Sequence, residues 1–243
     1  TEFKEILPKI EVAVLPVAST EQHGPHLPMG QDMASVLYVA RRAAERLYPQ
    51  IVVSPPPVTI GVSHHHMDYP GTLTLSPETF MSAIFEVCKS LRRHEIKKVV
   101  ILNGHGGNEP AIKLVGYKIR DQLAMKVAAF SYWQLLPQRI IDEVLEEKRH
   151  APPDQGEIPG HAGEFETSIA FVIHPSLVRR DLICEWTGKL PQYLKYAILN
   201  VQEYRPDGVN LNPGLGTLQK GEIVLTAIID ELEKYLKSLI EPP

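Results

Sequence analysis

The sequence predicts an α/β protein with a mainly parallel sheet flanked by helices. Short apolar runs of strand length alternate with longer segments whose apolar residues recur at helical spacing. Stretches rich in glycine and proline separate the two kinds of segment. The chain has 243 residues, 44% of them hydrophobic, and contains no repeat, linker or low-complexity block. We therefore predict a single domain over residues 1–243.

The first part of the chain predicts two strands around a helix. The run VAVLPV at 12–17 is typical of a buried strand, and residues 33–47 carry apolar side chains on one helical face. IVVS at 51–54 predicts a second, short strand, because three consecutive prolines stop it. A long loop is expected over 55–75.

The middle of the chain predicts a helix and then a strand–helix unit. Ser76 as N-cap, followed by a proline, predicts a helix start. The expected buried face of this helix comprises Phe80, Ile84, Val87 and Leu91. Residues 98–102 predict a strand that breaks at a glycine, and Asn108 caps the helix that follows.

The last part of the chain predicts two further strands and two helices. KVAAFSYW at 126–133 and TSIAFVIH at 167–174 have the composition of strands. Between them we expect a helix near 135–148 and a loop rich in proline and glycine over 150–163. A final amphipathic helix is predicted over 221–240.

Composition argues against several functions. The net charge is −4, and charges of both signs are interspersed along the chain. The sequence therefore has no basic patch of the kind that predicts binding to nucleic acid. The longest apolar runs stay well short of the roughly 18 residues that a membrane span needs. Cys88 and Cys184 are too few for a disulfide framework, which favours a reducing compartment and predicts a cytoplasmic location.

Side chains of types that can bind metals lie close together directly after the first predicted strand, in STEQHGPHLPMGQD at 19–32. Glu21 and His23 are two residues apart and face the same side of an extended segment. Asp32 stands at the start of the next helix, where an N-cap role is the alternative. Buried charges are costly unless they are paired or bind a metal, and residues 12–40 contain no Lys or Arg. The group as a whole therefore favours a metal site.

A second group lies in NGHGGN at 103–108. Its glycines allow a sharp turn, and His105 would point across the carboxyl edge of the sheet, where open α/β sheets bind their ligands. A phosphate-binding turn is the alternative. The segment matches neither the G-x-G-x-x-G nor the P-loop pattern, and a phosphate turn does not need a histidine. We therefore favour metal binding.

Two further stretches add candidates. GHAGEFETS at 160–168 contains His161, Glu164 and Glu166. The two carboxylates share a side if the predicted strand has begun, and a solvated strand entry is the alternative. The histidines at 64–66 cannot all serve one ion, because adjacent residues point apart, so one of them is expected to line the site.

Carboxylates and imidazoles in this number suit a pair of divalent ions such as Zn²⁺ or Mn²⁺. The H-E-x-x-H motif of one-zinc proteases and the G-x-S-x-G elbow of serine hydrolases are both absent from the sequence.

Taken in order, these motifs resemble the creatininase (creatinine amidohydrolase) family. The matching segments are EQHGPHLP with an Asp eleven residues after the Glu, YPGT, NGHGGN and HAGEFETS. The resemblance implies a metal-dependent hydrolase with two adjacent divalent metal ions per subunit, Zn²⁺, Mn²⁺ or Fe²⁺. It also implies a small-molecule substrate and a homo-oligomer such as a homohexamer.

The resemblance assigns roles by position. The metal ligands that it implies are Glu21, His23, Asp32, His105 and Glu166. Glu21 and His105 would bind one ion and His23 the other. Asp32 would bridge the two ions, and Glu166 is taken as the remaining carboxylate ligand.

The resemblance also implies a catalytic residue and a substrate pocket. His161 matches the catalytic histidine of the family, and Glu164 is expected to hold its imidazole in the right tautomer. Whether Glu164 or Glu166 is the metal ligand stays open. The residues expected around the substrate are His66, Tyr69, Gly106, Gly107 and Glu157.

Two positions depart from the true creatininases. Gly107 stands where they carry an acidic ligand, and Glu157 where they carry a tryptophan. We therefore expect a roomier, more polar pocket, in which a metal-activated water hydrolyses a C–N bond of a small cyclic or formamide-type amide. A ring-opening C–C hydrolase of a keto-inositol or other polyol ketone is one alternative. A non-catalytic metal- or phosphate-binding oligomeric module is the alternative from a different class.

Overall fold

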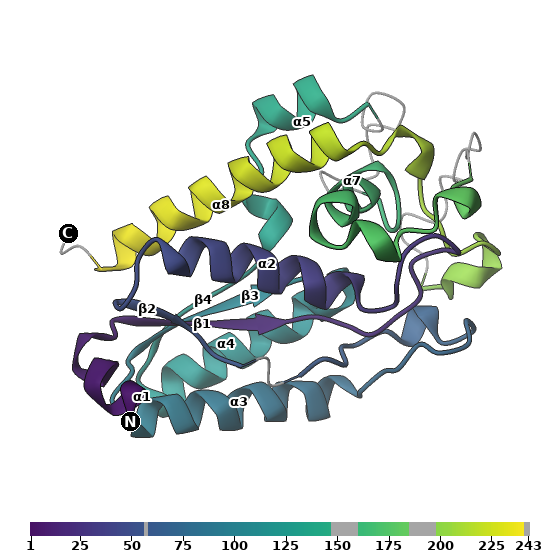
Figure 1. Cartoon of the computed structure of the whole chain (residues 1–243). Helices are drawn as coiled ribbons and strands as arrows, with labels where there is room; N and C mark the ends of the chain where they lie inside the picture. Colours follow the sequence, from purple (N-terminus) through teal and green to yellow (C-terminus); the bar gives the residue numbers. More distant parts are fainter. Residues whose placement is uncertain (56–57, 147–159, 185–197, 241–243) are drawn as a thin grey trace.

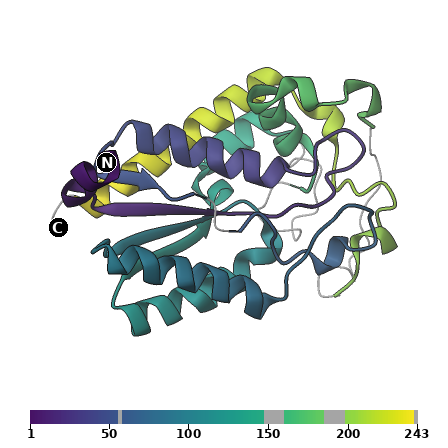
Figure 2. The same cartoon turned by 60° about the horizontal axis from the view of Figure 1, so that its bottom comes forward.

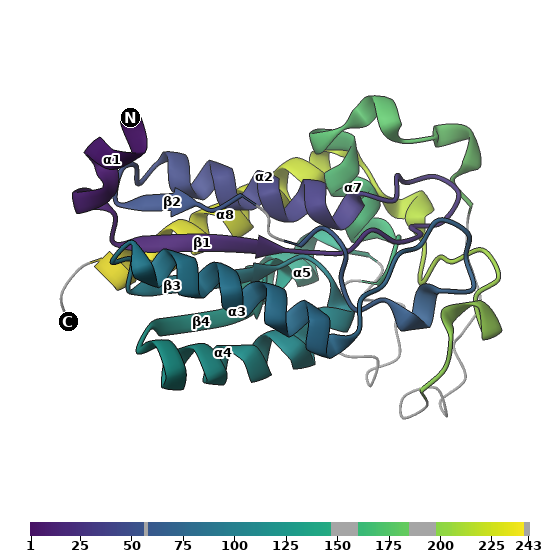
Figure 3. The same ribbon diagram turned by 90° about the horizontal axis from the view of Figure 1, so that it is seen from below.

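Four parallel strands form one sheet in the order β2-β1-β3-β4, seen from the side in Figure 1 and from below in Figure 3. The computed structural model describes residues 1–55, 58–146, 160–184 and 198–240. The strands are β1 (Val12–Val17), β2 (Ile51–Val53), β3 (Lys98–Asn103) and β4 (Lys126–Ser131). The predicted α/β fold with a parallel sheet is confirmed.

Helices cover both faces of the sheet. In the described parts of the chain they are α1 (Glu2–Ile6), α2 (Gln31–Glu45), α3 (Pro77–Arg93), α4 (Glu109–Leu123), α5 (Gln138–Val144), α7 (Glu164–Ile173) and α8 (Leu218–Ile240). Helices α2 and α8 lie over one face, and α3 and α4 cover the other (Figure 1). Alternate residues of β1 enter the two cores, Val12 and Val14 the first, Leu15 and Val17 the second. Because both faces are covered, the whole of β1 is buried.

The start of α3 follows the predicted cap. Ser76 Oγ accepts a hydrogen bond from Thr79 N at 3.2 Å. The buried residues of this helix are Phe80, Ile84 and Cys88. Val87 and Leu91, which were expected on the same face, are only half-buried.

Residues 167–174, predicted as a strand, are largely helical and belong to α7. This helix packs against α8 and α2, and seven of its ten residues are buried. A helix enclosed on most sides has a nearly continuous apolar sequence, which periodicity cannot distinguish from a buried strand. The helix predicted near 135–148 is the shorter α5, preceded by a 3₁₀ turn at Tyr132–Leu135. Residues 147 and 148 lie outside the described ranges.

The carboxyl ends of β1 and β3 open onto the loops that carry the candidate residues (Figure 2). Asn103 ends β3 and braces these loops. Its Nδ2 donates to Ser131 Oγ at 2.9 Å and to His105 O at 2.6 Å. Asn108 Oδ1 accepts from Val62 N at 2.8 Å, which ties the loop before α3 to the loop after β3.

No helix in the described part of the chain is long and apolar enough to cross a membrane.

Helices α7 and α8 touch at a glycine, and this contact generates a prediction about stability. A Cβ at Gly221 would overlap the carbonyl oxygen of Ser168. We expect Gly221→Ala to push the helices apart and to lower the free energy of unfolding by about 1–3 kcal/mol, measured by urea denaturation. Gly116→Ala in α4 is the matched control, because a Cβ there meets no atom closer than 3.7 Å. Its gain in helix propensity should stabilise the protein by up to about 1 kcal/mol. Equal stability of Gly221→Ala and the wild type would contradict the close contact.

Candidate metal centre

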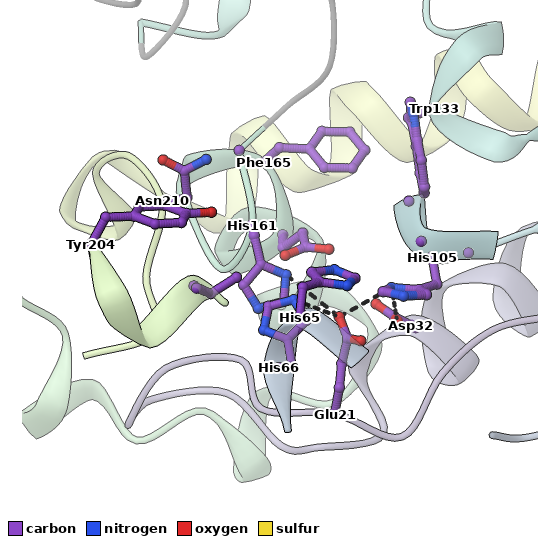
Figure 4. Close-up of a pocket in the computed structure, with 16 residues that line it drawn as sticks. Glu21, Asp32, His65, His66, His105, Trp133, His161, Phe165, Tyr204 and Asn210 are labelled. Carbon is purple, nitrogen blue, oxygen red and sulfur yellow. Dashed lines mark ion pairs between the residues drawn. The ribbon is translucent and has the colours of Figure 1, made fainter. Parts of the chain in front are cut away.

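Segments far apart in the sequence meet at the carboxyl edge of the sheet, and Figure 4 shows Glu21, Asp32 and His105 close together there. Glu21 and His23 come from the loop after β1, and Asp32 comes from the first turn of α2. His105 follows β3, and Glu166 lies in the first turn of α7. All of them are buried except Glu166, whose side chain is 13% exposed. The structure therefore brings together the five side chains that the resemblance implies as metal ligands.

Glu21, Asp32 and His105 form the first ligand cluster, with ligand atoms within 4.8 Å of one another. His105 Nδ1 lies 3.1 Å from Glu21 Oε1 and 3.4 Å from Asp32 Oδ2. The other ring nitrogen, Nε2, lies 3.1 Å from Val62 O. Since a carbonyl oxygen only accepts, Nε2 carries a proton and Nδ1 is the atom that faces the carboxylates. This is the ring orientation that a metal ligand requires.

His23, His161 and Glu166 form the second ligand cluster. His23 Nε2 lies 3.6 Å from Glu166 Oε1 and 2.9 Å from Asp32 Oδ1. Asp32 therefore faces His23 with one oxygen and His105 with the other, which is the arrangement that a bridging carboxylate needs. A glycine occupies the N-cap of α2, so the Asp32 side chain does not cap this helix.

In the described part of the chain, two buried carboxylate oxygens of the centre face an imidazole nitrogen without a well-formed hydrogen bond. Within the described residues, Glu21 Oε1 and Asp32 Oδ2 are buried and accept no hydrogen bond. Buried anionic oxygens are costly unless they are paired or bind a metal. Carboxylate oxygens and imidazole nitrogens together suit Zn²⁺, Mn²⁺ or Fe²⁺. The residues present therefore fit a site for divalent ions.

Protonation in the centre is governed by burial and by neighbouring charges. Burial opposes protonation of His105, but Glu21 and Asp32 outweigh it and raise its pKa to about 10. Burial also opposes protonation of His23, and Asp32 and Glu166 raise its pKa well above the usual value. Burial disfavours the charged form of Asp32, yet His23 and His105 keep its pKa below the usual range. The cluster thus favours positive charge beside its carboxylates, which is the charge that a bound cation supplies.

His161, a member of the second ligand cluster, comes from the turn before α7, and its ligand atoms also lie within 4.8 Å of those of Glu21 and His66. Its Nε2 donates to Gln22 O at 2.8 Å, which leaves Nδ1 without that proton and 3.7 Å from Glu21 Oε1. The two protons of Gln22 Nε2 go to His66 Nδ1 at 2.9 Å and to Gly208 O at 3.0 Å. Burial lowers the pKa of His161. Gln22 therefore orients both imidazoles, a role that the sequence did not reveal.

Glu164 and Glu166 do not share a side, which corrects an expectation from the sequence. Because α7 is a helix, residues two apart point about 200° apart around its axis. Glu164 Oε1 pairs with Lys220 and accepts a hydrogen bond from the backbone of residue 146 at 3.2 Å. The expected role of Glu164 in fixing the tautomer of His161 thus falls to the carbonyl oxygen of Gln22. Of the two glutamates, Glu166 is the one that belongs to a ligand cluster.

The residues expected around the substrate divide into two groups. His66, Gly106 and Gly107 line a cavity of about 280 Å³. The carboxylates of both ligand clusters line the same cavity. Tyr69 is not among the residues that line it, because its hydroxyl donates to Arg205 O.

Gly107 has no room for a side chain. A Cβ at this position would overlap Val62 O and would lie 2.8 Å from His65 Cε1. The ring of His65 stacks on His105 with centroids 5.6 Å apart and lines the cavity (Figure 4). The glycine therefore does not leave the roomier pocket that the sequence led us to expect, because Val62 O, His105 and His65 occupy the space.

The cavity has an aromatic wall that the sequence did not reveal. Trp133, Phe165 and Tyr204 line it together with Asn210, and Figure 4 shows them around the imidazoles. Trp133 lies just beyond the carboxyl end of β4, and this position is the signal that could have found it. Glu157, where the true creatininases carry a tryptophan, lies outside the described residues.

A parallel sheet with clusters of carboxylates and imidazoles at its carboxyl edge is the arrangement that a metal-dependent enzyme needs. The family model described as creatinine amidohydrolase matches residues 1–236, and the chain belongs to this creatininase family. It is a metal-dependent amidohydrolase of that family.

Relatives within the family have different activities. The chain is 28% identical to the mycofactocin precursor peptide peptidase of Mycolicibacterium smegmatis, over 94% of this chain and 85% of that protein. It is 25% identical to the creatinine amidohydrolase of Pseudomonas putida, over 95% and 90%. It is 24% identical to the 3-dehydro-scyllo-inosose hydrolase of Thermotoga maritima, over 99% and 81%. A solved manganese creatininase shares the fold with a TM-score of 0.81 at 22% identity, covering 99% of this chain and 96% of that one. A creatininase mutant of the Zn–Zn type has the same TM-score.

The two oxygens of Asp32 face His23 and His105, so its removal should affect both of the ions that the resemblance implies. We expect Asp32→Ala, loaded with Mn²⁺ or Zn²⁺, to lose more metal than a one-ion ligand would, measured by elemental analysis. Asp121→Ala is the control, because Asp121 is an exposed carboxylate that pairs with Arg120 away from the centre. If Asp32→Ala keeps both ions and its activity, the bridging assignment is wrong.

Proposed function

We propose that this protein hydrolyses a C–N bond of a polar amide, in a small cyclic or formamide-type substrate, with two divalent ions. The observation that supports the proposal is that Asp32 of the first ligand cluster faces His23 of the second cluster with one oxygen and His105 with the other. Glu21 and His105 would hold one ion, with Asp32 as the bridge. His23 and Glu166 would hold the other.

Zn²⁺, Mn²⁺ or Fe²⁺ would suit these ligands. When bound, two such ions polarise a carbonyl group and lower the pKa of water toward ~7. The manganese and zinc forms of creatininase support this choice of metals.

His161 would supply the proton that the leaving nitrogen needs. Its Nε2–H is anchored on Gln22 O at 2.8 Å, so the ring cannot turn away and Nδ1 stays directed at the centre. Imidazole exchanges protons readily near neutral pH, which suits it to receive a proton at Nδ1 and pass it on.

The lining of the cavity supports a substrate with both polar and apolar parts. His65, His66 and Asn210 offer hydrogen-bonding groups, and Trp133 and Phe165 offer apolar surface. This mixture suits a small polar amide that also has an apolar part. The relationship to the 3-dehydro-scyllo-inosose hydrolase favours a second candidate, the ring-opening hydrolysis of a polyol ketone.

We further propose that the protein acts on its small-molecule substrate as a cytoplasmic homo-oligomer, such as a homohexamer. The free thiols of Cys88 and Cys184 support a reducing compartment. Light scattering on the purified protein measures the mass in solution. A monomeric mass would contradict the proposed homo-oligomer.

The anchored ring of His161 leads to a prediction about catalysis. His161→Ala should keep both ions and lose turnover by about 10²–10⁴-fold, because a proton donor has been removed. Metal content and kcat are measured on the same sample. His64→Ala is the control, since His64 is an exposed histidine and should keep full turnover. Loss of an ion in His161→Ala would make this residue a ligand instead.

The substrate is tested with a panel of polar amides, lactams, formamides, polyol ketones and creatinine, on protein loaded with Mn²⁺ or Zn²⁺. We expect turnover of an amide that chelation abolishes, and poor turnover of creatinine. Creatinine hydrolysis with kcat/KM of about 10⁴ M⁻¹s⁻¹ or more would overturn the substrate assignment and leave the metal site untouched. Turnover of the polyol ketones alone would favour the second candidate. Metal binding without any turnover would favour a non-catalytic module.

A further inference from the structure

A buried serine, Ser63, lies behind the first ligand cluster. Its hydroxyl oxygen lies 2.6 Å from Glu21 Oε2, 2.5 Å from Ser19 Oγ and 3.2 Å from His105 Nε2. Ser63 and Ser19 are both 0% exposed, so bulk water does not compete for these contacts. One hydroxyl thus touches two of the three residues of the cluster.

The donors and acceptors at this hydroxyl follow from counting protons. An ionised carboxylate only accepts, so Ser63 donates its single proton to Glu21 Oε2. Ser19 must then donate to Ser63 Oγ, because the proton of Ser63 is already used. His105 carries a proton on Nε2, which points to Val62 O at 3.1 Å and to Ser63 Oγ at 3.2 Å. The hydrogen bonds therefore run from Ser19 and His105 to Ser63, and from Ser63 to Glu21.

This arrangement turns the ligand atoms inward. Glu21 Oε2 is occupied by the hydroxyl, and Oε1, which accepts no hydrogen bond in the described part of the chain, faces the centre. His105 Nε2 is occupied on the same side, and Nδ1 faces the centre 3.1 Å from Glu21 Oε1. Ser63 thus fixes which atom each of the two ligands presents.

We propose that Ser63, supported by Ser19, is a positioning residue that prepares Glu21 and His105 to bind their ion. The inference rests on the proposed metal-dependent function. Ser63 lies in the loop between β2 and α3, 42 residues along the chain from both Glu21 and His105. The inference therefore adds a further segment to those that form the first ligand cluster.

The second ligand cluster supplies an internal control. Among the contacts of the described residues, the hydroxyl of Ser63 bonds to neither His23 nor Glu166. Its removal should weaken the binding of one ion and spare the other. A merely structural role would instead destabilise the fold and weaken both ions together.

The test is a calorimetric titration of the metal-free protein with Mn²⁺, for the wild type and for Ser63→Ala. We expect two binding steps in the wild type. In the variant one step should weaken by about 10–100-fold, the range for loss of a group that orients a ligand, while the other step stays unchanged. The absorption spectrum of the Co²⁺-loaded protein, which reports ligand geometry, should change as well.

Two variants guard against a trivial result. Ser168→Ala is the matched control, because it also removes a buried serine hydroxyl, one that donates to Glu164 O at 2.7 Å and touches neither Glu21 nor His105. It should leave both binding steps unchanged. If Ser63→Ala does not fold, Ser63→Cys keeps a side chain of similar size with a weaker donor, and its affinity for the first ion should be intermediate.

The outcomes separate this inference from the proposed function. Unchanged affinity for both ions in Ser63→Ala, or equal weakening of both, would overturn the positioning role. Wild-type protein that binds no divalent ion would overturn the proposed function, and the inference with it.

Discussion

The burial of two carboxylates at the carboxyl edge of the sheet is the constraint on which the rest of the structure depends. Glu21 is 0% exposed and Asp32 is 3% exposed. An unpaired buried charge costs several kcal/mol, and no Lys or Arg occurs over residues 12–40 to pair with them. The compensation comes from histidines instead, from His23 in the same loop and from His105 after β3. The loop after β1, the start of α2 and the loop after β3 therefore converge for a reason of charge balance.

Polar side chains hold these segments in one arrangement. Asn103 and Asn108 tie the loop after β3 to neighbouring backbone, and Ser63 ties the loop before α3 to the carboxylate of Glu21. Such buried networks specify a single geometry when their members are satisfied. Helix α7 is placed differently. Glu164 on one side pairs with Lys220 of α8, and Glu166 on the other side enters the second ligand cluster. The first turn of α7 therefore carries both the ion pair with α8 and the glutamate of the second ligand cluster.

The sequence could predict the parts of this site that depend on residue type and local pattern, but not those that depend on contacts between distant segments. Strands β1 and β3 could be predicted from their apolar runs, and the ligand residues stood out because charged and imidazole groups followed these strands without compensating cations. Helix α7 could not be recognised, because burial on most sides removes the alternation that marks a helix. The partner of His161 could not be found either, since a backbone carbonyl, that of Gln22, leaves no trace in residue type. Ser63 acts through a contact between segments, which a single sequence does not encode locally.

Glycine at position 107 changes the electrostatics of the cavity and not its size, because Val62, His105 and His65 occupy the space that a side chain would need. A carboxylate at that position would add a negative charge. Burial, with a further contribution from His105, lowers the pKa of His65 to about 4, so this ring is neutral at pH 7. With the same cations bound, the centre is therefore one unit more positive than it would be with a carboxylate at 107. A more positive centre interacts more strongly with electron-rich oxygens, such as those of carbonyl, hydroxyl and formyl groups. The proposed preference for a polar amide thus rests on Gly107 and its neighbours, because the glycine carries no charge and Val62, His105 and His65 keep the space closed.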